Sequence, residues 1–239
     1  MPDRRIHRGP DPQDAEAFGP LAVPLLREAV SDLSWLMGRG YAIDSALKLV
    51  GDRWSLSARQ RLAVRRAACP DQLRLSRAER RLESADLRGR GLWIDGFNVL
   101  TTVESALGGA PILHCRDGAY RDLAGVHGNY RRVAETVPAI QRIAATLAAL
   151  ELREVRWLLD RPVSNSGRLA GILRDIIAEG AWPWTVELLD RPDAVLKESL
   201  ECVATADSAV LDRCRSWFNL ARVVIESSGV PAHVIELSA

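Results

Sequence analysis

The sequence lacks the long apolar runs that a bilayer-spanning helix requires. No stretch approaches the roughly eighteen consecutive apolar residues of a membrane helix. The amino-terminal residues 1–5, with the sequence MPDRR, also lack the apolar segment of a secretory signal peptide. We therefore expect a cytoplasmic protein that does not bind a membrane.

Cysteine is scarce, and its four copies are scattered. Cys69, Cys115, Cys202 and Cys214 form no CxxC pair and have no histidine at zinc-ligand spacing. This pattern argues against a zinc site. It predicts reduced thiols that are mostly buried.

A large net charge is also absent, but the charges are unevenly distributed. The formal net charge is +1; residues 1–90 hold 17 basic and 12 acidic residues, whereas residues 91–239 hold 15 and 19. Between residues 53 and 90, eleven arginines face only four acids. A basic arm joined to an acidic body suits a polyanionic partner. The alternative is an ordinary solvated helical surface.

Glycine and proline divide the chain into three predicted parts. Residues 1–20 carry many breakers and are expected to form a flexible leader, followed by a helical, arginine-rich domain over residues 21–88 and an α/β domain over residues 91–239. In the helical part, capping boxes at Ser57/Gln60 and Ser76/Glu79 predict two helix starts. A DNA-binding helix-turn-helix over residues 42–68 is an alternative interpretation of this helical part.

Short apolar runs alternate with helical stretches after residue 91. The runs are at residues 92–94, 155–159, 185–189, 202–204 and 233–237. The helical stretches are at residues 100–107, 136–151, 167–179, 208–214 and 217–228. This alternation predicts a parallel sheet covered on both faces. Residues 111–115 are expected to add a strand, followed by a polar loop.

Aspartates follow four of the five runs. They are Asp95, Asp160, Asp190 and Asp207. The carboxyl ends of strands in such a sheet open onto one edge, so these carboxylates are expected to face one cleft. Neighbouring carboxylates repel unless a cation neutralises them, and ligands that are all oxygen favour Mg²⁺ or Mn²⁺. The alternative role for each is a helix N-cap, and Asp190 is assigned that structural role.

Two of these segments resemble known motifs. The sequence DGFNVL at residues 95–100 resembles the opening motif of NYN and other PIN-like nuclease domains, and VATADS at residues 203–208 resembles their later Thr/Ser-x-Asp motif. Nearly the whole chain resembles an uncharacterised prokaryotic family that joins a helical domain to a PIN-like domain. The resemblance implies a three-layer α/β/α domain with a five-stranded, mainly parallel sheet of order 3-2-1-4-5, preceded by a small all-α domain.

The resemblance also implies a set of site residues. The catalytic set would be Asp95, Asp160, Asp207 and Asp212, of which the first three bind Mg²⁺ or Mn²⁺, with Asn98, Glu104 and Ser208 in support. Typical PIN domains carry a further acid on a helix between the first two motifs. Here Glu151 ends the helix predicted over residues 136–151, and Glu104 is the nearer substitute. Loss of one ligand would leave binding without catalysis.

Two polar segments are candidates for contacts with nucleic acid. In the loop over residues 160–168, Ser164, Asn165 and Ser166 could donate to a phosphate, with Arg168 as the counter-charge; an ordinary capping loop is the alternative. The segment 116–131 mixes charges and rings. From it Arg121 could bind phosphate, Tyr120, His127 or Tyr130 could stack on a base, and Asp117 and Asp122 could extend the acidic site. A turn-rich surface insertion is the alternative for that segment.

The prediction from sequence is thus a metal-dependent phosphodiesterase that acts on nucleic acid, RNA rather than DNA. A binding module that has lost turnover is the main alternative. A small-molecule phosphohydrolase ranks last, since the chain lacks a closely spaced Asp-x-Asp motif. A homodimer would be indicated if Trp182, Trp184 or Trp217 were exposed.

Overall fold

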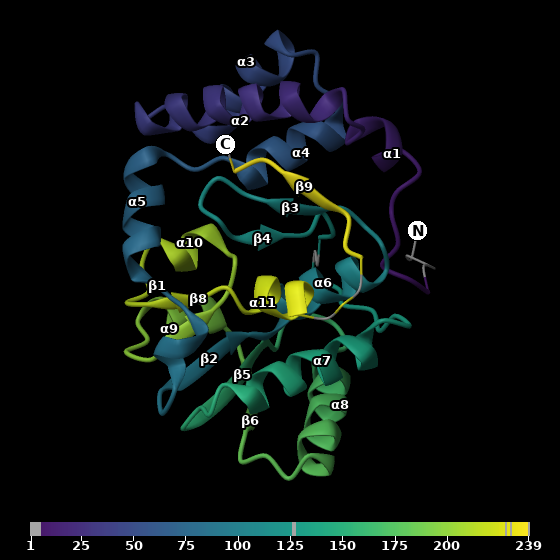
Figure 1. Cartoon of the computed structure of the whole chain (residues 1–239), viewed down its shortest axis with the longest axis vertical. Coiled ribbons are helices and arrows are strands. Elements are labelled where there is room, and N and C mark those ends of the chain that lie inside the picture. Colours follow the sequence, from purple (N-terminus) through teal and green to yellow (C-terminus); the bar gives the residue numbers. More distant parts are fainter. Residues whose placement is uncertain (1–5, 126–127, 228, 230, 239) are drawn as a thin grey trace.

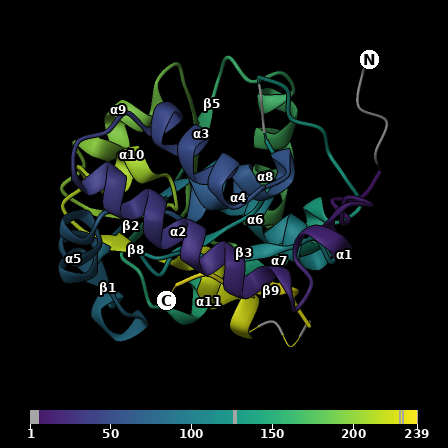
Figure 2. The same cartoon turned by 90° about the horizontal axis from the view of Figure 1, so that it is seen from above.

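The amino-terminal third is helical, as predicted. The computed structural model describes residues 6–125, 128–227, 229 and 231–238 (Figure 1). The first helices are α1 (Asp14–Ala17), α2 (Ala22–Gly38), α3 (Ile43–Arg53), α4 (Ala58–Ala67) and α5 (Asp71–Arg80). Helices α2, α3 and α4 lie together at the top of Figure 1, and α2 runs across the molecule in the view from above (Figure 2).

One of the two predicted capping boxes is confirmed. The Ser57 hydroxyl accepts the backbone N–H of Gln60 at 3.2 Å, and the Gln60 side chain accepts the N–H of Ser57 at 3.0 Å, so α4 begins there. The box at Ser76 and Glu79 is wrong, because both residues lie inside α5. That helix begins earlier, directly after Pro70, with an aspartate in its first turn that favours the positive helix end.

Residues of the predicted leader pack against the helical region. Asp14 of α1 is buried and forms an ion pair of 2.7 Å with Arg59 of α4. Phe18 is also buried, in the same apolar cluster as α2 and α4. Residues 1–5 lie outside the described part of the chain.

A six-stranded sheet forms the centre of the α/β region. Its strands are β1 (Arg81–Leu82), β2 (Gly91–Asp95), β5 (Glu154–Asp160), β6 (Thr185–Leu189), β7 (Cys202–Ala204) and β8 (Trp217–Phe218). The order is β1-β8-β7-β2-β5-β6, and all pairings are parallel. Since β2 pairs with β5 on one side and β7 on the other, the chain reverses its direction of growth between β2 and β7.

Helices cover both faces of this sheet, so the region has three layers. On one face lie α6 (Gly96–Leu107), α7 (Thr136–Ala149), α8 (Ser166–Glu179) and α11 (Leu220–Ser227). On the other face lie α9 (Pro192–Lys197) and α10 (Ser208–Leu211). Side chains of β5 alternate between the two cores, with Trp157 in the first and Leu158 in the second. A short 3₁₀ helix, η1 (Ser84–Leu87), leads into β2.

The predicted fifth strand is wrong in its placement. The four strands β6-β5-β2-β7 follow the expected order, but the next position is filled by β8, where a helix was predicted to begin at residue 217. The run at residues 233–237 instead forms β9 (Val234–Glu236). It joins β3 (Ile112–His114) and β4 (Tyr120–Arg121) in a second, three-stranded sheet.

The second sheet packs against the helical region. Leu113, Leu123, Ile235 and Leu237 are buried in one cluster with apolar side chains of α2, α3 and α4. This shared core explains why β9 lies in the second sheet, because Ile235 of β9 and the neighbouring Leu237 pack against the apolar side chains of these helices. The strand at residues 111–115 was predicted, but the residues after it are not a surface insertion, since Ala119 to Leu123 are all buried.

Two other expectations concern tryptophans and membranes. Trp217 is fully buried, so it cannot form an exposed interface; Trp182 and Trp184 are partly buried and stack on each other with ring centroids 4.5 Å apart. Within the part of the chain that the structure describes, no helix combines the length and apolarity needed to cross a bilayer.

Candidate functional site

An acidic cleft of about 640 Å³ opens at the carboxyl ends of β2, β5 and β7. Asp95, Asp160 and Asp207 line it, as does Asp193 from the first turn of α9. This position is the reversal point of the strand order, where ligands bind in open α/β sheets. The structure therefore brings together the three aspartates that the sequence placed at one edge.

Asp95 is the last residue of β2 and the N-cap of α6. Its carboxylate accepts the backbone N–H of Asn98 at 3.4 Å and the hydroxyl of Thr205 at 2.8 Å. The glycine that follows is required by packing. A Cβ atom at Gly96 would lie 2.5 Å from Cδ2 of Leu159, so only glycine lets α6 begin directly against β5.

Asp207 occupies the equivalent position after β7. Its Oδ1 accepts the backbone N–H groups of Ala209 and Val210 at 2.8 and 3.0 Å, which caps α10. Oδ2 has no hydrogen-bond donor among the described residues. The cap role and the cleft role that the sequence left open are therefore compatible in one side chain.

Asn98 connects the two aspartate-bearing loops. Its side-chain oxygen accepts the backbone N–H of Ala206 at 2.7 Å, so the first turn of α6 is tied to the loop after β7. Thr205 makes a second connection, because its hydroxyl accepts the N–H of Asp207 at 3.0 Å while it donates to Asp95. Asn98 lines the cleft and supports the site as the sequence predicted.

Three carboxylates of the cleft have raised pKa values. Burial, together with the charges of Asp193 and Asp207, raises the pKa of Asp95 to about 7 against the hydrogen bond from Thr205. Partial burial and the charge of Asp193 raise the pKa of Asp160. Partial burial and the charge of Asp207 raise the pKa of Asp193. Such a group favours a bound cation, which would stabilise the ionised forms.

Asp193 is the cleft residue that sequence reasoning missed. The signal was an acid in the first turn of the helix after a strand, next to Pro192, which is suited to a helix start. The sequence analysis considered only Asp190, which directly follows β6, and assigned it a structural role. Asp190 is exposed, its Oδ1 lies 3.6 Å from Nε of Arg161, and it does not line the cleft.

Asp212 and Arg121 belong to a largely buried ion-pair network that borders the acidic cleft. Arg77 donates to Oδ1 of Asp212 at 2.8 and 2.6 Å and also contacts Asp117. Arg121 donates to Asp117 at 2.7 Å. Burial opposes the ionisation of Asp117, but the charges of Arg121 and Arg77 lower its pKa to about 2. Asp212 does not line the cleft; Arg121 does, but its guanidinium donates to Asp117 and to the carbonyl of Ala206.

Ser208 and Asp122 do line the acidic cleft. The Ser208 hydroxyl accepts from Arg121 at 3.3 Å, so it connects the network to the cleft. Asp122, which the sequence suggested as an extension of the acidic site, accepts the hydroxyls of Thr101 and Thr102 at 3.3 and 3.0 Å through Oδ2. Its Oδ1 lies 3.4 Å from Nη1 of Arg66, so the carboxylate is already held by two hydroxyls and a guanidinium group.

Glu104 is fully buried away from the acidic cleft. It accepts from Nε of Arg8 at 2.8 Å and from the Thr136 hydroxyl at 2.6 Å, and the Tyr130 hydroxyl also donates to it. Burial raises its pKa against these donors. Glu151 is exposed and pairs with Arg88 at 2.9 Å, before β5 begins. Neither candidate for the additional PIN acid lines the cleft.

The predicted phosphate loop borders a different cleft. Asn165 and Arg168 line a neighbouring cleft of about 660 Å³. Asn165 has a left-handed backbone (φ +68°), and its side chain donates to the carbonyl of Tyr130 at 2.8 Å. The Ser166 hydroxyl donates to the carbonyl of Arg161 at 3.1 Å, and the Ser164 carbonyl accepts the N–H of Tyr130.

Two of the three rings proposed for base stacking are buried. Tyr130 and Tyr120 are buried, with relative exposures of 1% and 5%. Tyr120 donates to Glu226 at 3.0 Å. His127 lies outside the described residues.

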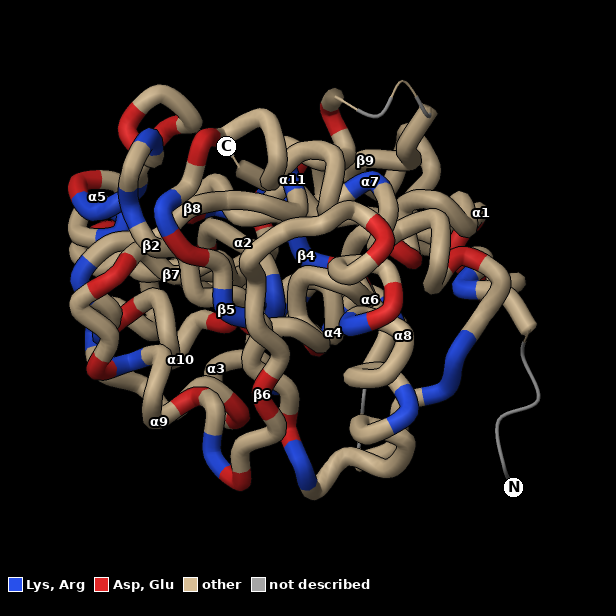
Figure 3. The backbone as a smooth tube through the Cα atoms, turned by 90° about the horizontal axis from the view of Figure 1, so that it is seen from below, with Lys and Arg blue, Asp and Glu red and all other residues tan. Residues whose placement is uncertain are grey.

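The arginine-rich helices contribute two side chains to the acidic cleft, Arg65 and Arg66 of α4. Arg65 pairs with Asp44, and Arg66 contacts Asp122 and donates to the carbonyl of Ala124 at 2.9 Å. Most arginines between residues 53 and 90 pair with an acid in this way; they are Arg53, Arg59, Arg61, Arg65, Arg66, Arg74, Arg77, Arg81 and Arg88. Acidic and basic positions are accordingly interspersed along the backbone (Figure 3).

The acidic cleft offers carboxylate oxygens, which are the ligands that Mg²⁺ and Mn²⁺ prefer. Among the described residues, no group of three or more His, Cys, Asp or Glu side chains is placed so that it could hold a metal ion. Mg²⁺ commonly keeps several waters and binds through one or two carboxylates together with substrate phosphates. Aspartates that share a cleft without converging on one point are compatible with that mode of binding.

The four cysteines are free and buried, as predicted. Burial raises the pKa of Cys69 and of Cys115 to about 11, and that of Cys202 to about 12. They therefore contribute neither thiolate nucleophiles nor metal ligands to the acidic cleft.

Comparisons with known proteins match both parts of the chain. A family model described as "Domain of unknown function (DUF5616)" matches residues 84–223, and one described as "Protein of unknown function (DUF434)" matches residues 25–80. An uncharacterized protein of Methanocaldococcus jannaschii is 33% identical over 187 residues, which cover 78% of this chain and 88% of that protein. No solved structure matches the chain.

Proposed function

We propose that this chain, which belongs to the family described as the domain of unknown function DUF5616, is a divalent-metal-dependent nuclease that hydrolyses RNA. One observation carries the proposal. Asp95, Asp160, Asp193 and Asp207, from four separate places in the chain, line one cleft, and the pKa values of the first three are raised. Carboxylates with perturbed pKa values in a cleft are typical of functional sites.

A PIN-like character of the α/β region is part of the same proposal. The two motifs that suggested it, at residues 95–100 and 203–208, make contact through Asn98 and Ala206 and through Asp95 and Thr205. Motifs that are far apart in the chain thus share one site. The reversal of strand order between β2 and β7 also suits such a domain.

Each side chain has a definite part in the proposed chemistry. Asp95, Asp160 and Asp207 would hold Mg²⁺ or Mn²⁺, and Asp193 adds negative charge at the exposed rim. When bound, the cation would polarise the scissile phosphate and activate the attacking water. Hydrogen bonds of Thr205 and Asn98 hold the loop after β7 against the end of β2 and the start of α6. Arg65 and Arg66 also line the cleft, where they pair with Asp44 and Asp122.

The test is cleavage of a labelled single-stranded RNA by the purified full chain with Mn²⁺, with Mg²⁺ and with EDTA. Cleavage is expected with metal, and it should be lost in Asp95→Asn and in Asp207→Asn. Asp190→Asn is the matched control, because Asp190 lies at the same sheet edge, is exposed and does not line the cleft. Cleavage that survives Asp95→Asn, or that is lost equally in the control, would rule out this site.

A second candidate function is a PIN-like module that binds nucleic acid or a nucleotide without turnover. The burial of Glu104 among Arg8, Tyr130 and Thr136 favours it, because the nearest substitute for the additional family acid is withdrawn from the cleft. Under this alternative, RNA or a nucleotide binds but no cleavage occurs with either metal.

A further inference from the structure

A second cleft, defined here as the basic cleft, adjoins the acidic cleft. Both clefts are lined by Ala124 and Gly125, so they meet at this short segment. The basic cleft has a volume of about 660 Å³. Its walls come from the amino-terminal residues 7–11, from the segment 129–133 and from the first turns of α8.

Positive charge dominates its lining. Arg8, Arg59, Arg131, Arg132 and Arg168 contribute guanidinium groups. Asp11 is the single acid among the described lining residues.

Two of these arginines are neutralised within the protein. Arg8 pairs with Glu104 and Arg59 pairs with Asp14. Arg131, Arg132 and Arg168 are exposed and form no ion pair with any described acid. Three guanidinium charges are therefore available to an anionic ligand.

Backbone hydrogen bonds connect the segments that carry these arginines. The N–H of Ala134 donates to the carbonyl of Ile6 at 2.9 Å, which fastens the amino-terminal segment beside residues 131 and 132. The N–H of Ser164 donates to the carbonyl of Gly128 at 3.0 Å, which joins the loop before α8 to the segment 129–133. Because its backbone is held in this way, the cluster loses little backbone freedom when a ligand binds.

The start of α8 adds to the positive potential. This helix has 14 residues, and its N-cap, Asn165, makes no capping hydrogen bond with its side chain. Asn165 uses that side chain to hold Tyr130 instead. The positive end of the helix dipole therefore lies beside the same cleft as Arg168.

We infer that the basic cleft binds the phosphodiester backbone of a single RNA strand whose neighbouring segment occupies the acidic cleft. The inference rests on the proposed function, which it deepens by assigning the substrate a path past Ala124 and Gly125. Guanidinium groups bind phosphates through paired N–H donors, and three of them in one cleft suit a ligand that carries several phosphates. A free phosphate or a mononucleotide shares this chemistry but engages fewer of the arginines.

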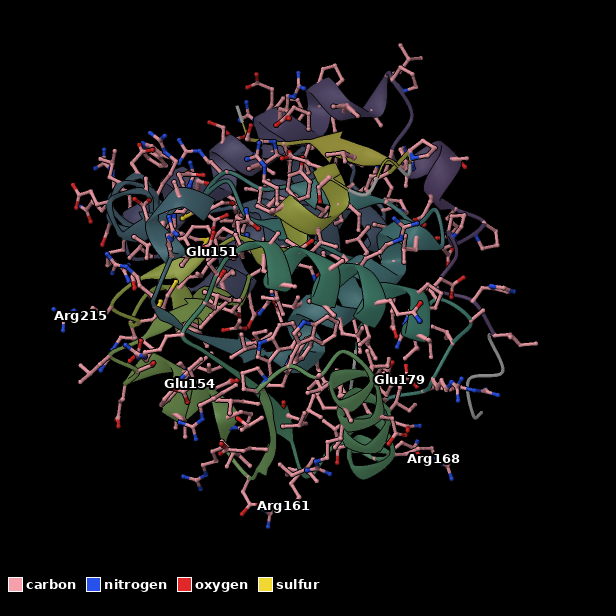
Figure 4. All side chains as sticks on the ribbon, turned by 60° about the horizontal axis from the view of Figure 1, so that its bottom comes forward. Glu151, Glu154, Arg161, Arg168, Glu179 and Arg215 are labelled. Carbon is pink, nitrogen blue, oxygen red and sulfur yellow. The ribbon has the colours of Figure 1, made fainter. Side chains whose placement is uncertain are left out.

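The test replaces the available arginines together, as Arg131→Gln, Arg132→Gln and Arg168→Gln in one chain. Arg161→Gln is the matched control. Arg161 and Arg168 flank the same loop and both extend outward from the ribbon (Figure 4), but Arg161 does not line the basic cleft. Binding of a fluorescein-labelled oligouridine is measured by anisotropy in EDTA, where metal-dependent cleavage cannot occur.

The triple variant is expected to bind the oligouridine about tenfold more weakly, or weaker still, and to lower the slope of log Kd against log salt by about 2, at roughly 0.7 for each lost phosphate contact. The control should bind as the native chain does. Equal binding by the triple variant, equal loss in the control, or a native chain that binds no RNA would overturn the inference. Displacement of the oligouridine by equimolar inorganic phosphate or uridine monophosphate would also overturn it, in favour of a small-anion site.

These outcomes separate the inference from the nuclease proposal. RNA binding that depends on the three arginines, in a chain that never cleaves, would support the basic cleft and reject the nuclease. Metal-dependent cleavage that requires Asp95, combined with RNA binding unaffected by the triple substitution, would reject the basic cleft alone. Because the three arginines are exposed, far-UV circular dichroism and the melting temperature should remain those of the native chain.

Discussion

The hydroxyl of Thr205 donates a hydrogen bond of 2.8 Å to Oδ2 of Asp95. The same hydroxyl accepts the backbone N–H of Asp207 at 3.0 Å. One buried side chain thus orients two aspartates that come from neighbouring strands, β2 and β7. The geometry of the acidic cleft depends on this connection.

Thr205→Val should therefore weaken both the fold and the site. The substitution keeps the shape but leaves the buried Asp95 carboxylate without its strongest donor, at a cost of about 1–3 kcal/mol in the free energy of unfolding. Urea denaturation measures this cost, and RNA cleavage should fall as well. Thr205→Ser retains the hydroxyl and should recover most of both. Equal stability of the valine variant and the native chain would show that the hydrogen bond has no energetic role.

Stability in the absence of metal should fall as pH rises. Burial raises the pKa of Asp95 to about 7 from 3.8, so the folded state binds this proton more tightly than the unfolded state does. The resulting stabilisation is fully present below pH 3.8 and is lost as pH rises through 7; its upper limit is on the order of 4 kcal/mol. Melting temperatures in EDTA should decrease between about pH 5 and pH 8.

Asp95→Asn provides the control for that pH dependence. Asparagine does not ionise, so the decrease between pH 5 and pH 8 should be smaller in this variant than in the native chain. Added Mn²⁺ should raise the melting temperature of the native chain at pH 8 and have less effect on the variant. An identical pH profile in the two proteins would contradict the raised pKa of Asp95.

The buried pair of Arg8 and Glu104 should anchor the amino-terminal segment. Arg8→Met leaves the Glu104 carboxylate buried without its counter-charge, which should lower the free energy of unfolding by about 3–5 kcal/mol. Arg8→Met combined with Glu104→Gln removes both charges and should be more stable than Arg8→Met alone. Urea denaturation of the three proteins measures the difference. If the double variant were the less stable one, the pair would not be the source of the effect.

Two glycine substitutions should have opposite effects. Gly96→Ala places a Cβ 2.5 Å from Cδ2 of Leu159 and 3.0 Å from the carbonyl oxygen of Leu158, which should cost about 1–3 kcal/mol and disturb the position of Asp95. Gly167→Ala in α8 meets nothing within 4 Å and should be neutral or slightly stabilising. Thermal denaturation compares the two, and an unaffected melting temperature in Gly96→Ala would show that β5 yields easily.

Much of the local structure could be predicted from short-range patterns. The box at Ser57 and Gln60 starts α4, and near-continuous apolar runs became β2, β5, β6 and β7 in the expected order. These features depend on residues a few positions apart. The box at Ser76 and Glu79 failed because a proline upstream starts α5 earlier, which a pattern of four residues cannot register.

The roles of charged residues were harder to predict, because they depend on partners far away in the chain. Arg121 was expected to bind a phosphate; it lines the acidic cleft, and its guanidinium pairs with Asp117. Asp212 was expected in the acidic cleft, yet it is the partner of Arg77 from α5. Nothing near these residues in the sequence shows which acid and which base will meet. In the sequence, an arginine that forms an ion pair in the fold cannot be distinguished from one that does not.

The sequence by itself determined that helices precede an α/β region, and it determined the strand-end positions of Asp95, Asp160 and Asp207. Both follow from periodicity and chain order, because parallel strands must end at a common edge. Only the tertiary structure decided that β9 joins the second sheet and packs against the helical region, and that Asp193 lines the acidic cleft. It also decided that Arg131, Arg132 and Arg168 line the adjoining basic cleft without forming ion pairs with described acids. Those outcomes depend on which surfaces are buried against each other, and long-range packing decides that.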